Sequence, residues 1–140
     1  MGLRCGYLGT VSEVRAEAWS ASPQPEVDLE LPAGAFGAVG RLVVAGVASR
    51  LGLTVDRIDE LQLAVDETLR RPASRDALSL RITPTTHELR VRVGPVFVRD
   101  GERRDLERLL STLVDDAATH DSGEDVWIDL RVARTARATA

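Results

Sequence analysis

The sequence predicts an α+β fold, a two-layer sandwich in which helices cover one face of a mixed, mostly antiparallel sheet. Two patterns in the chain support this fold class. Short segments alternate apolar and polar residues with the period of two of half-buried strands, and longer segments repeat apolar residues at helical spacing. Composition agrees, because 44% of the 140 residues are apolar, which is enough for one domain with a single packed core.

One strand and a first helix open the predicted domain. The segment VDLEL alternates and places Val27, Leu29 and Leu31 on one face of a strand. Pro32 then ends the strand, since proline has no N–H to donate to a ladder. A helix is expected from about residue 34 to residue 51. Its predicted apolar stripe consists of Phe36, Val39, Val43 and Val47.

A second helix follows after a short turn. Gly52 suits the left-handed position behind the first helix, and Thr54 is a good N-cap for the second. Asp56 in the first turn complements the helix dipole. The helix is expected to end one or two residues before Pro72, which cannot continue it. Its predicted apolar stripe consists of Ile58, Leu61, Val65 and Leu69.

The second half of the domain is predicted as a hairpin, a third helix and a final strand. Two alternating runs flank the turn PTTHE, which is typical of a hairpin. The third helix is expected over residues 103–116, and DSGED forms a turn before the last strand, VWIDLRV. The residues predicted to face the core are Leu78, Leu80, Ile82, Leu89, Val91, Val93, Leu106, Leu109, Leu110, Leu113, Val126, Ile128, Leu130 and Val132.

The two ends of the chain are predicted to lie outside the domain. Residues 1–25 lack a sustained period and end in a stretch rich in Ser and Pro, so we expect a flexible N-terminal segment. Docking of Trp19 on the domain is the alternative. The domain itself is expected at residues 26–133, followed by a loose C-terminal tail at residues 134–140.

Composition and charge argue against several functions. The net charge of -4 makes nucleic acid an improbable main partner, and Cys5 alone can form neither an internal disulfide nor a Cys-based zinc site. His87 and His120 lack companions at ligand spacing, and the acidic residues at 115–125 lack the order of a calcium loop, so no metal site is expected. Without a visible signal peptide or membrane span, a cytoplasmic location is expected.

The segment LGLTVDRIDELQLAVDE, residues 51–67, carries a resemblance to a known family. With the predicted order of elements, it resembles the anti-sigma factors of the RsbW and SpoIIAB type, which belong to the GHKL superfamily of ATPases with the Bergerat fold. The likeness covers about residues 27–132 and is strongest over residues 41–67. The motif LAVDE alone is weak, and its weight comes from following the strand, helix and turn in the family's order.

The resemblance implies a nucleotide site whose metal ligand this chain lacks. In the family, a glutamate on the second helix activates the attacking group, and an asparagine one turn later binds Mg²⁺. Glu67 occupies the first position, but Arg71 replaces the asparagine, and the chain contains no Asn at all. Because a guanidinium cannot coordinate Mg²⁺, we expect Arg71 to form an i,i+4 ion pair with Glu67 instead.

Two further parts of the family's nucleotide site are missing. Gly94 and Pro95 stand near the family's adenine-reading aspartate, and neither has a carboxylate. The lid over the phosphates is reduced to FVRDGERR, with Gly101 as a lone glycine. We therefore expect a degenerate actinobacterial form that uses no cofactor, has no catalytic residue and keeps Glu67 as a vestigial general-base position. The alternative is an active serine kinase that phosphorylates its anti-anti-sigma partner with ATP.

The resemblance also implies protein partners. The protein would sequester an alternative sigma factor of the stress or developmental class, a STAS-type anti-anti-sigma factor would release it by partner switching, and the chain would form a homodimer. Arg41 falls on the family's sigma-contacting arginine, with a solvated helix residue as the alternative. Arg81, Arg90 and Arg92 form either a basic stripe for an acidic partner or a solubilising face. A dimerisation module and an unrelated α+β domain are the remaining alternatives.

Overall fold

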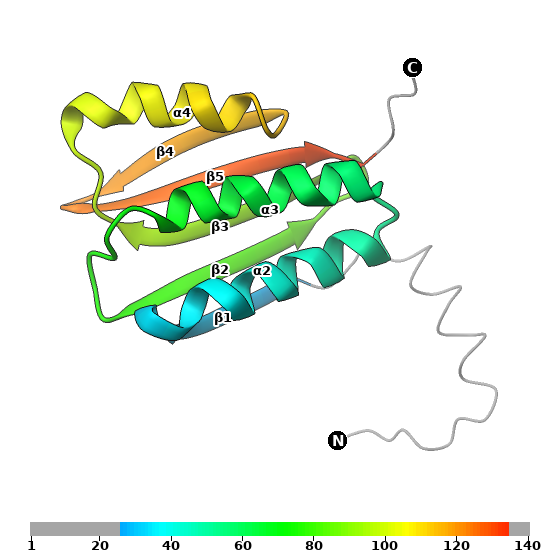
Figure 1. Cartoon of the computed structure of the whole chain (residues 1–140), viewed down its shortest axis with the longest axis horizontal. Helices are drawn as coiled ribbons and strands as arrows, with labels where there is room; N and C mark the ends of the chain where they lie inside the picture. Colours follow the sequence, from blue (N-terminus) through cyan, green and yellow to red (C-terminus); the bar gives the residue numbers. More distant parts are fainter. Residues whose placement is uncertain (1–25, 135–140) are drawn as a thin grey trace.

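The computed structural model describes residues 26–134, in which one sheet carries all of the helices on a single face (Figure 1). The expectations for residues 1–25, including those for Cys5 and Trp19, and for residues 135–140 lie outside the described residues. In chain order the elements are β1 (Val27–Pro32), α2 (Ala33–Arg50), α3 (Val55–Leu69), β2 (Ala77–Pro84), β3 (Glu88–Val96), the short 3-10 helix η1 (Asp100–Glu102), α4 (Arg103–Ser111), β4 (Asp116–Ser122) and β5 (Asp125–Ala133).

The sheet has five strands in the order β1-β2-β3-β5-β4, and every neighbouring pair is antiparallel. The predicted α+β sandwich with helices on one face is confirmed. The expected mixed sheet is wrong for the described residues. The cause is the paired crossover: α2 runs back along β1 and α3 returns, so that β2 starts with Ala77 beside Pro32 and runs against β1.

Strand β4 corrects the prediction for residues 103–125. Helix α4 ends at Ser111 rather than at residue 116, and residues 116–122 form an edge strand that the sequence did not predict. No residue of β4 is fully buried, so its sequence DAATHDS lacks the alternation by which a strand is recognised. Backbone pairing with β5 defines it, and Glu107 of α4 accepts hydrogen bonds from N and Oγ1 of Thr119 at 2.9 and 2.7 Å.

The core lies between the sheet and the helical layer. Its strand side follows the predicted alternation, which is confirmed for the hairpin and for β5. Apart from Leu109, which is 42% exposed, and Leu113, which is half-buried, α4 also packs as predicted through Leu106 and Leu110. The buried strand residues are Leu78, Leu80, Ile82, Leu89, Val91, Val93, Val126, Ile128, Leu130 and Val132.

The buried stripe of α2 agrees with the predicted one only in part, since Phe36 is buried but Val43 and Val47 are half-buried at its edge. The residues that face the sheet are Phe36, Gly40, Val44 and Ala48, whereas Val39 is 39% exposed. Gly40 leaves room for the aromatic ring, because a Cβ at this position would lie 3.0 Å from Cε1 of Phe36. The difference arises because α2 is apolar on nearly all sides, and periodicity cannot select the buried face of such a helix.

The connection between α2 and α3 is confirmed. Gly52 has φ +83°, and Oγ1 of Thr54 accepts a hydrogen bond from N of Arg57 at 3.2 Å. Leu61 and Val65 are buried on α3 as predicted, and Ile58 and Leu69 are half-buried. Within residues 26–134, no helix combines the length and the apolarity that a membrane crossing requires.

Candidate functional site

The two residues that the resemblance places at the nucleotide lie at the end of α3 and just after it, Glu67 in the last turn and Arg71 two residues beyond Leu69. Oε2 of Glu67 lies 3.3 Å from Nε of Arg70, and its Oε1 lies 4.0 Å from Nη1 of Arg71. The predicted i,i+4 ion pair is therefore at the longest distance at which two such groups count as paired. Arg71 instead donates from Nη1 to the main-chain oxygen of Glu67 at 3.2 Å. The carboxylate of Glu67 is therefore held by two cations rather than presented to a metal.

Arg71 occupies the place of the missing asparagine. Its side chain is 21% exposed, and its Nε is buried without a hydrogen-bond partner among the described residues. A guanidinium has only donors and a fixed positive charge, so it repels a divalent cation instead of binding it. If the resemblance places Arg71 correctly, the metal-ligand position therefore holds a group that cannot bind the metal.

The segment after α3 is bound directly to the end of β3. N of Phe97 donates to O of Pro72 at 2.8 Å, and N of Ser74 donates to O of Pro95 at 3.1 Å. Ala73 and Val96 form an isolated antiparallel bridge between the same two segments. We call this contact the α3–β3 junction. It joins the segment that follows Arg71 to the end of the strand that carries Gly94 and Pro95.

Asp125 extends the junction to β5. Its Oδ1 accepts a hydrogen bond from Oγ of Ser74 at 2.7 Å, and its Oδ2 accepts one from Nε of Arg75 at 2.8 Å. These bonds, first from Ser74 and then from Arg75, hold the pKa of Asp125 below its ordinary value. Asp125 is 9% exposed, so the carboxylate is a structural tie and not a free base.

The other parts of a nucleotide site do not fit Mg-ATP either. Gly94 and Pro95 are buried and offer no carboxylate, and Trp127 covers Gly94 so closely that a Cβ there would lie 2.9 Å from its ring. Only residues 97–102 connect β3 to α4, which leaves no length for a lid. The residues present therefore do not match the donor set that the family uses for the nucleotide and its metal.

Arg41 lies on the helical layer, at the seam between α2 and α3. Its Nη1 pairs with Oδ2 of Asp66 at 3.4 Å, and its main-chain oxygen accepts a hydrogen bond from Nε2 of Gln62 at 3.2 Å. The side chain remains 49% exposed. The residue that the resemblance assigns to sigma binding is thus accessible, and its ion pair is long and solvated.

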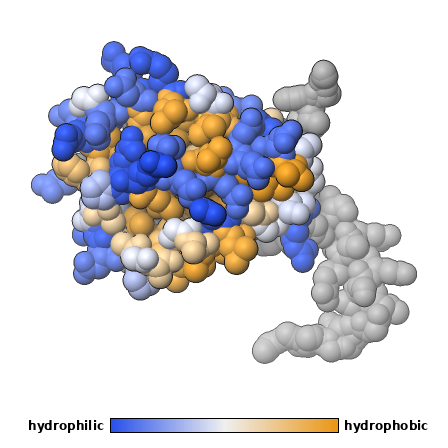
Figure 2. Space-filling model, in the orientation of Figure 1, coloured by the Kyte–Doolittle hydropathy of each residue, from blue (hydrophilic) through white to orange (hydrophobic). Residues whose placement is uncertain are grey.

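Both helices of this seam also carry exposed apolar side chains. Sequence periodicity did not reveal them. Leu42 is 72% exposed on α2, and Leu63 is 53% exposed on α3. Figure 2 shows hydrophobic patches among the polar residues of this face. The signal that could have found them is the nearly uninterrupted apolar and glycine run of α2, which has more apolar surface than a helix on a sheet can bury.

The opposite face of the sheet is covered by ion pairs. Arg81 pairs with Asp28 at 2.8 Å and Arg90 with Glu88 at 2.7 Å. The structure therefore brings Arg81, Arg90 and Arg92 onto one face, as predicted, but the basic stripe is neutralised by neighbouring carboxylates.

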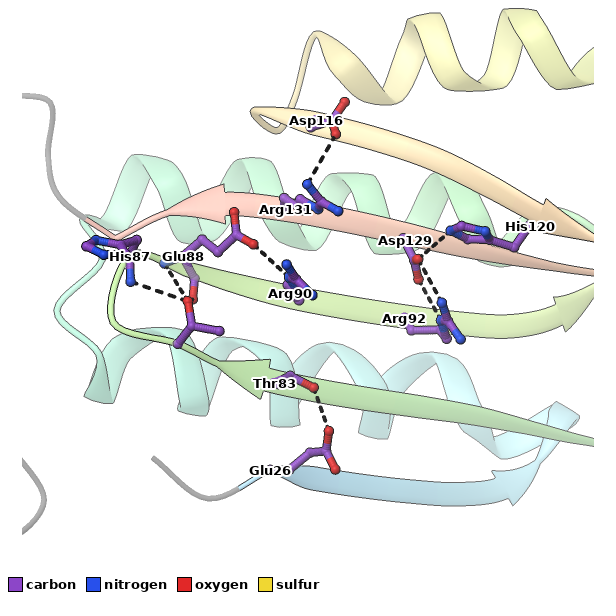
Figure 3. Close-up of polar contacts among 11 residues, drawn as sticks. Glu26, Thr83, His87, Glu88, Arg90, Arg92, Asp116, His120, Asp129 and Arg131 are labelled. Atoms are coloured by element: carbon purple, nitrogen blue, oxygen red, sulfur yellow. Dashed lines mark hydrogen bonds and ion pairs between the residues drawn. The ribbon is translucent and has the colours of Figure 1, made fainter. Parts of the chain in front are cut away.

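Asp129 is the centre of the largest of these clusters (Figure 3). Arg92 donates from Nε and Nη2 to its two oxygens at 2.7 and 2.9 Å, and Nε2 of His120 lies 2.7 Å from Oδ2. Burial acts to raise the pKa of Asp129, but the hydrogen bonds and charge of Arg92, with a smaller contribution from His120, lower it below its ordinary value. Neither His87 nor His120 joins a group of three or more metal-ligating side chains in the described part of the chain.

The comparisons with known proteins bear on the fold. No protein-family model matches the chain, and no curated protein matches its sequence. Among solved structures, the chain is similar to the crystal structure of the RsbU and RsbW domains of Rv1364c from Mycobacterium tuberculosis, with a TM-score of 0.64 and 16% sequence identity. The match covers 84% of this chain and 35% of that chain. The fold is therefore RsbW-like.

Proposed function

We propose that this protein is an anti-sigma factor of a degenerate, actinobacterial RsbW type that sequesters an alternative sigma factor of the stress or developmental class. Binding covers the surfaces that the sigma factor needs for core RNA polymerase, and a STAS-type anti-anti-sigma factor competes for the protein and releases the sigma factor. The protein acts in the cytoplasm as a homodimer. The RsbW-like fold supports this class of function.

The observation that carries the proposal is the α3–β3 junction. The bonds from Phe97 to Pro72 and from Ser74 to Pro95 join the segment after Arg71 to the end of β3, near which the resemblance places the adenine-reading aspartate. Arg71 adds a fixed positive charge at the implied metal position. Together they favour a protein that retains the scaffold for binding and has lost the kinase reaction, with Glu67 as a vestige.

The proposed partner surface is the helical layer around Arg41. The half-exposed guanidinium and the exposed Leu42 and Leu63 offer one charged and two apolar contacts on neighbouring helices. Such a mixed apolar and charged surface is what a protein interface uses for affinity and for orientation, respectively. No reaction at Glu67 is needed for inhibition by occlusion.

A binding test decides between this function and its alternatives. Each alternative sigma factor of the native host is purified and tested for capture by the full chain. We expect one of them to bind with a Kd of micromolar or below. Failure of every sigma factor to bind would refute the proposal. Transfer of labelled phosphate from ATP to a STAS partner, lost in Glu67→Ala, would establish the serine kinase instead.

A further inference from the structure

We infer that residues 13–18 of this chain add to the free edge of β1 as a sixth, antiparallel strand of the sheet. We call these residues segment 13–18. The inference goes beyond the proposed function and does not depend on it. With β1 covered in this way, the proposed homodimer would form through another surface.

Strand β1 lies at one edge of the sheet, with main-chain groups that point outward. N of Ala33 donates to O of Asp76 at 2.9 Å, in the same register as the pairs that β1 forms with β2. Because hydrogen-bonded pairs alternate along an antiparallel ladder, the odd-numbered residues of β1 bond to β2. The N–H and C=O groups of Asp28 and Glu30 therefore point away from the sheet, and no other part of residues 26–134 bonds to them.

The opposite edge of the sheet shows how such groups are covered in this fold. N of Thr119 in β4 donates to Oε2 of Glu107 in α4 at 2.9 Å, and Arg103 of α4 pairs with Asp121 of β4. An uncovered edge is a template for pairing with other chains. Since the described residues supply no such cover for β1, this is the edge at which another strand can add.

The position of residues 1–25 makes part of them the nearest candidate for that strand. They precede β1 directly, so the chain enters the domain at this same edge. The stretch rich in Ser and Pro, residues 20–25, lies between segment 13–18 and β1 and suits a reversal of direction. Because a short link joins the two segments, the effective concentration of segment 13–18 at the edge is on the order of millimolar.

The side chains of segment 13–18 match the two faces of β1. Residues 1–25 as a whole lack a sustained period, but EVRAEA alternates charged and apolar side chains over the same six residues that β1 has. Pairing residues 13–18 with residues 32–27 places Val14, Ala16 and Ala18 beside the apolar residues of β1. Those apolar residues are only half-buried, so an added strand would remove more of their surface from water.

Charge favours this segment over a second copy of β1. Asp28 and Glu30 are exposed on the open face, and an antiparallel copy would place carboxylates opposite carboxylates, which destabilises the pairing. Segment 13–18 instead brings Arg15 beside Glu30, which forms no ion pair within residues 26–134. Glu17 then lies beside Asp28, whose carboxylate already binds Arg81 at 2.8 Å.

Hydrogen exchange of the full chain, followed by NMR, tests the added strand. In any antiparallel pairing that keeps the apolar sides together, N–H of Glu17 faces β1 and N–H of Ala16 faces away. Glu17→Pro and Ala16→Pro are therefore a matched pair, since proline is tolerated at an edge only where the lost N–H faces solvent. We expect the amides of Asp28 and Glu30 to exchange about tenfold faster in Glu17→Pro than in wild type, and Ala16→Pro to behave like wild type.

The outcomes of the exchange experiment are distinct. The amide of Leu29, which bonds to β2, should be equally protected in all three proteins and reports on the fold. Equal exchange of Asp28 and Glu30 in wild type and Glu17→Pro would overturn the inference. The same acceleration in both proline variants would also overturn it, because strand pairing would then not be the cause. Protection that increases with protein concentration would mean that a second copy covers β1, which again contradicts the inference.

Nuclear Overhauser contacts in the wild-type chain identify the occupant without any variant. We expect backbone contacts between Arg15 and Glu30 and between Glu17 and Asp28. A sample mixed from isotope-labelled and unlabelled chains tells contacts within one molecule from contacts between two, and we expect the former. Contacts only between molecules, a helical contact pattern over segment 13–18, or the absence of contacts between this segment and β1 would each overturn the inference.

Discussion

The exposed side chains on the two faces of this protein differ: those on the helical face include apolar side chains and a long ion pair, and those on the sheet face form close ion pairs. On the helical layer, Leu42 and Leu63 are left in solvent, and Arg41 has a single long ion pair. On the open face of the sheet, Arg81 and Arg92 pair at 2.7–2.9 Å with carboxylates from adjacent strands. These charged groups of the sheet face therefore already have partners in water. The exposed apolar side chains of the helical face would instead be stabilised if another protein covered them.

The largest expected effect distinguishes the two sides of α2 itself. Phe36 is fully buried under the helix, so Phe36→Ala should lower the free energy of unfolding by about 3–5 kcal/mol. Leu42→Ala on the exposed side of the same helix should change it by less than about 0.5 kcal/mol. Urea unfolding of both variants measures the difference. Similar losses for the two would show that Leu42 is packed and that the helical face is not free.

Charge reversal on each face tests which one binds. Arg41 and Arg81 have similar exposed fractions, 49% and 53%, so Arg41→Glu and Arg81→Glu form a matched pair. We expect Arg41→Glu to weaken sigma binding about tenfold, which corresponds to about 1.4 kcal/mol, and Arg81→Glu to leave the affinity unchanged. Titration of the sigma factor into both variants provides the measurement. The opposite ranking would move the docking surface to the open face of the sheet.

A smaller effect is expected where the sheet face is neutralised. Asp129→Asn removes the carboxylate charge that Arg92 binds with two hydrogen bonds, and it should lower the free energy of unfolding by about 1 kcal/mol at pH 7. Because the pKa of Asp129 is lower in the folded state, this stabilisation is complete above about pH 4 and is lost as the pH falls through the folded pKa.

Urea unfolding of wild type and Asp129→Asn as a function of pH checks that prediction. The two curves should converge in acid. A gap that persists at pH 2 would mean that the aspartate contributes by shape rather than by charge. Sigma binding at pH 7 should be the same for both proteins, because the cluster lies on the face opposite the helices.

The smallest effect is expected at the position of the vestigial base. Glu67 is half-exposed and paired with Arg70 and Arg71, so Glu67→Ala should change the free energy of unfolding by less than about 1 kcal/mol. Sigma inhibition in a transcription assay should be unchanged. Loss of inhibition in a folded Glu67→Ala variant would show that Glu67 is needed for function, as a working nucleotide site would require. The functional surface would then not be limited to the helical face around Arg41.

The sequence predicts those parts of the fold in which one side of an element is polar and the other apolar. Alternation predicts the inward faces of the hairpin and of β5, and capping chemistry at Gly52 and Thr54 predicts the turn between α2 and α3. Strand β4 was missed because it lies half in solvent at the edge of the sheet. The buried face of α2 was misassigned because a helix that is apolar all round has no periodic signal.

The features of the candidate site likewise divide into those that the sequence predicts and those that depend on the tertiary structure. The proposed replacement of a metal ligand by Arg71 comes from the sequence alone, because it changes the chemistry at a motif position. The α3–β3 junction is not visible there, since its hydrogen bonds use backbone atoms of Pro72, Ser74 and Pro95 and depend on tertiary placement. The pairing of Arg92 with Asp129 requires the strand order and register, which local patterns do not supply.

The most direct test of the central claim is a calorimetric titration of the full chain with Mg-ATP. We expect the scaffold to bind protein and not nucleotide, because Arg71 places a fixed positive charge at the position that the resemblance assigns to the metal ligand. The expected result is no heat of binding up to millimolar nucleotide from a sample that still binds its sigma factor. Saturable binding with a micromolar Kd that depends on Mg²⁺ would contradict it.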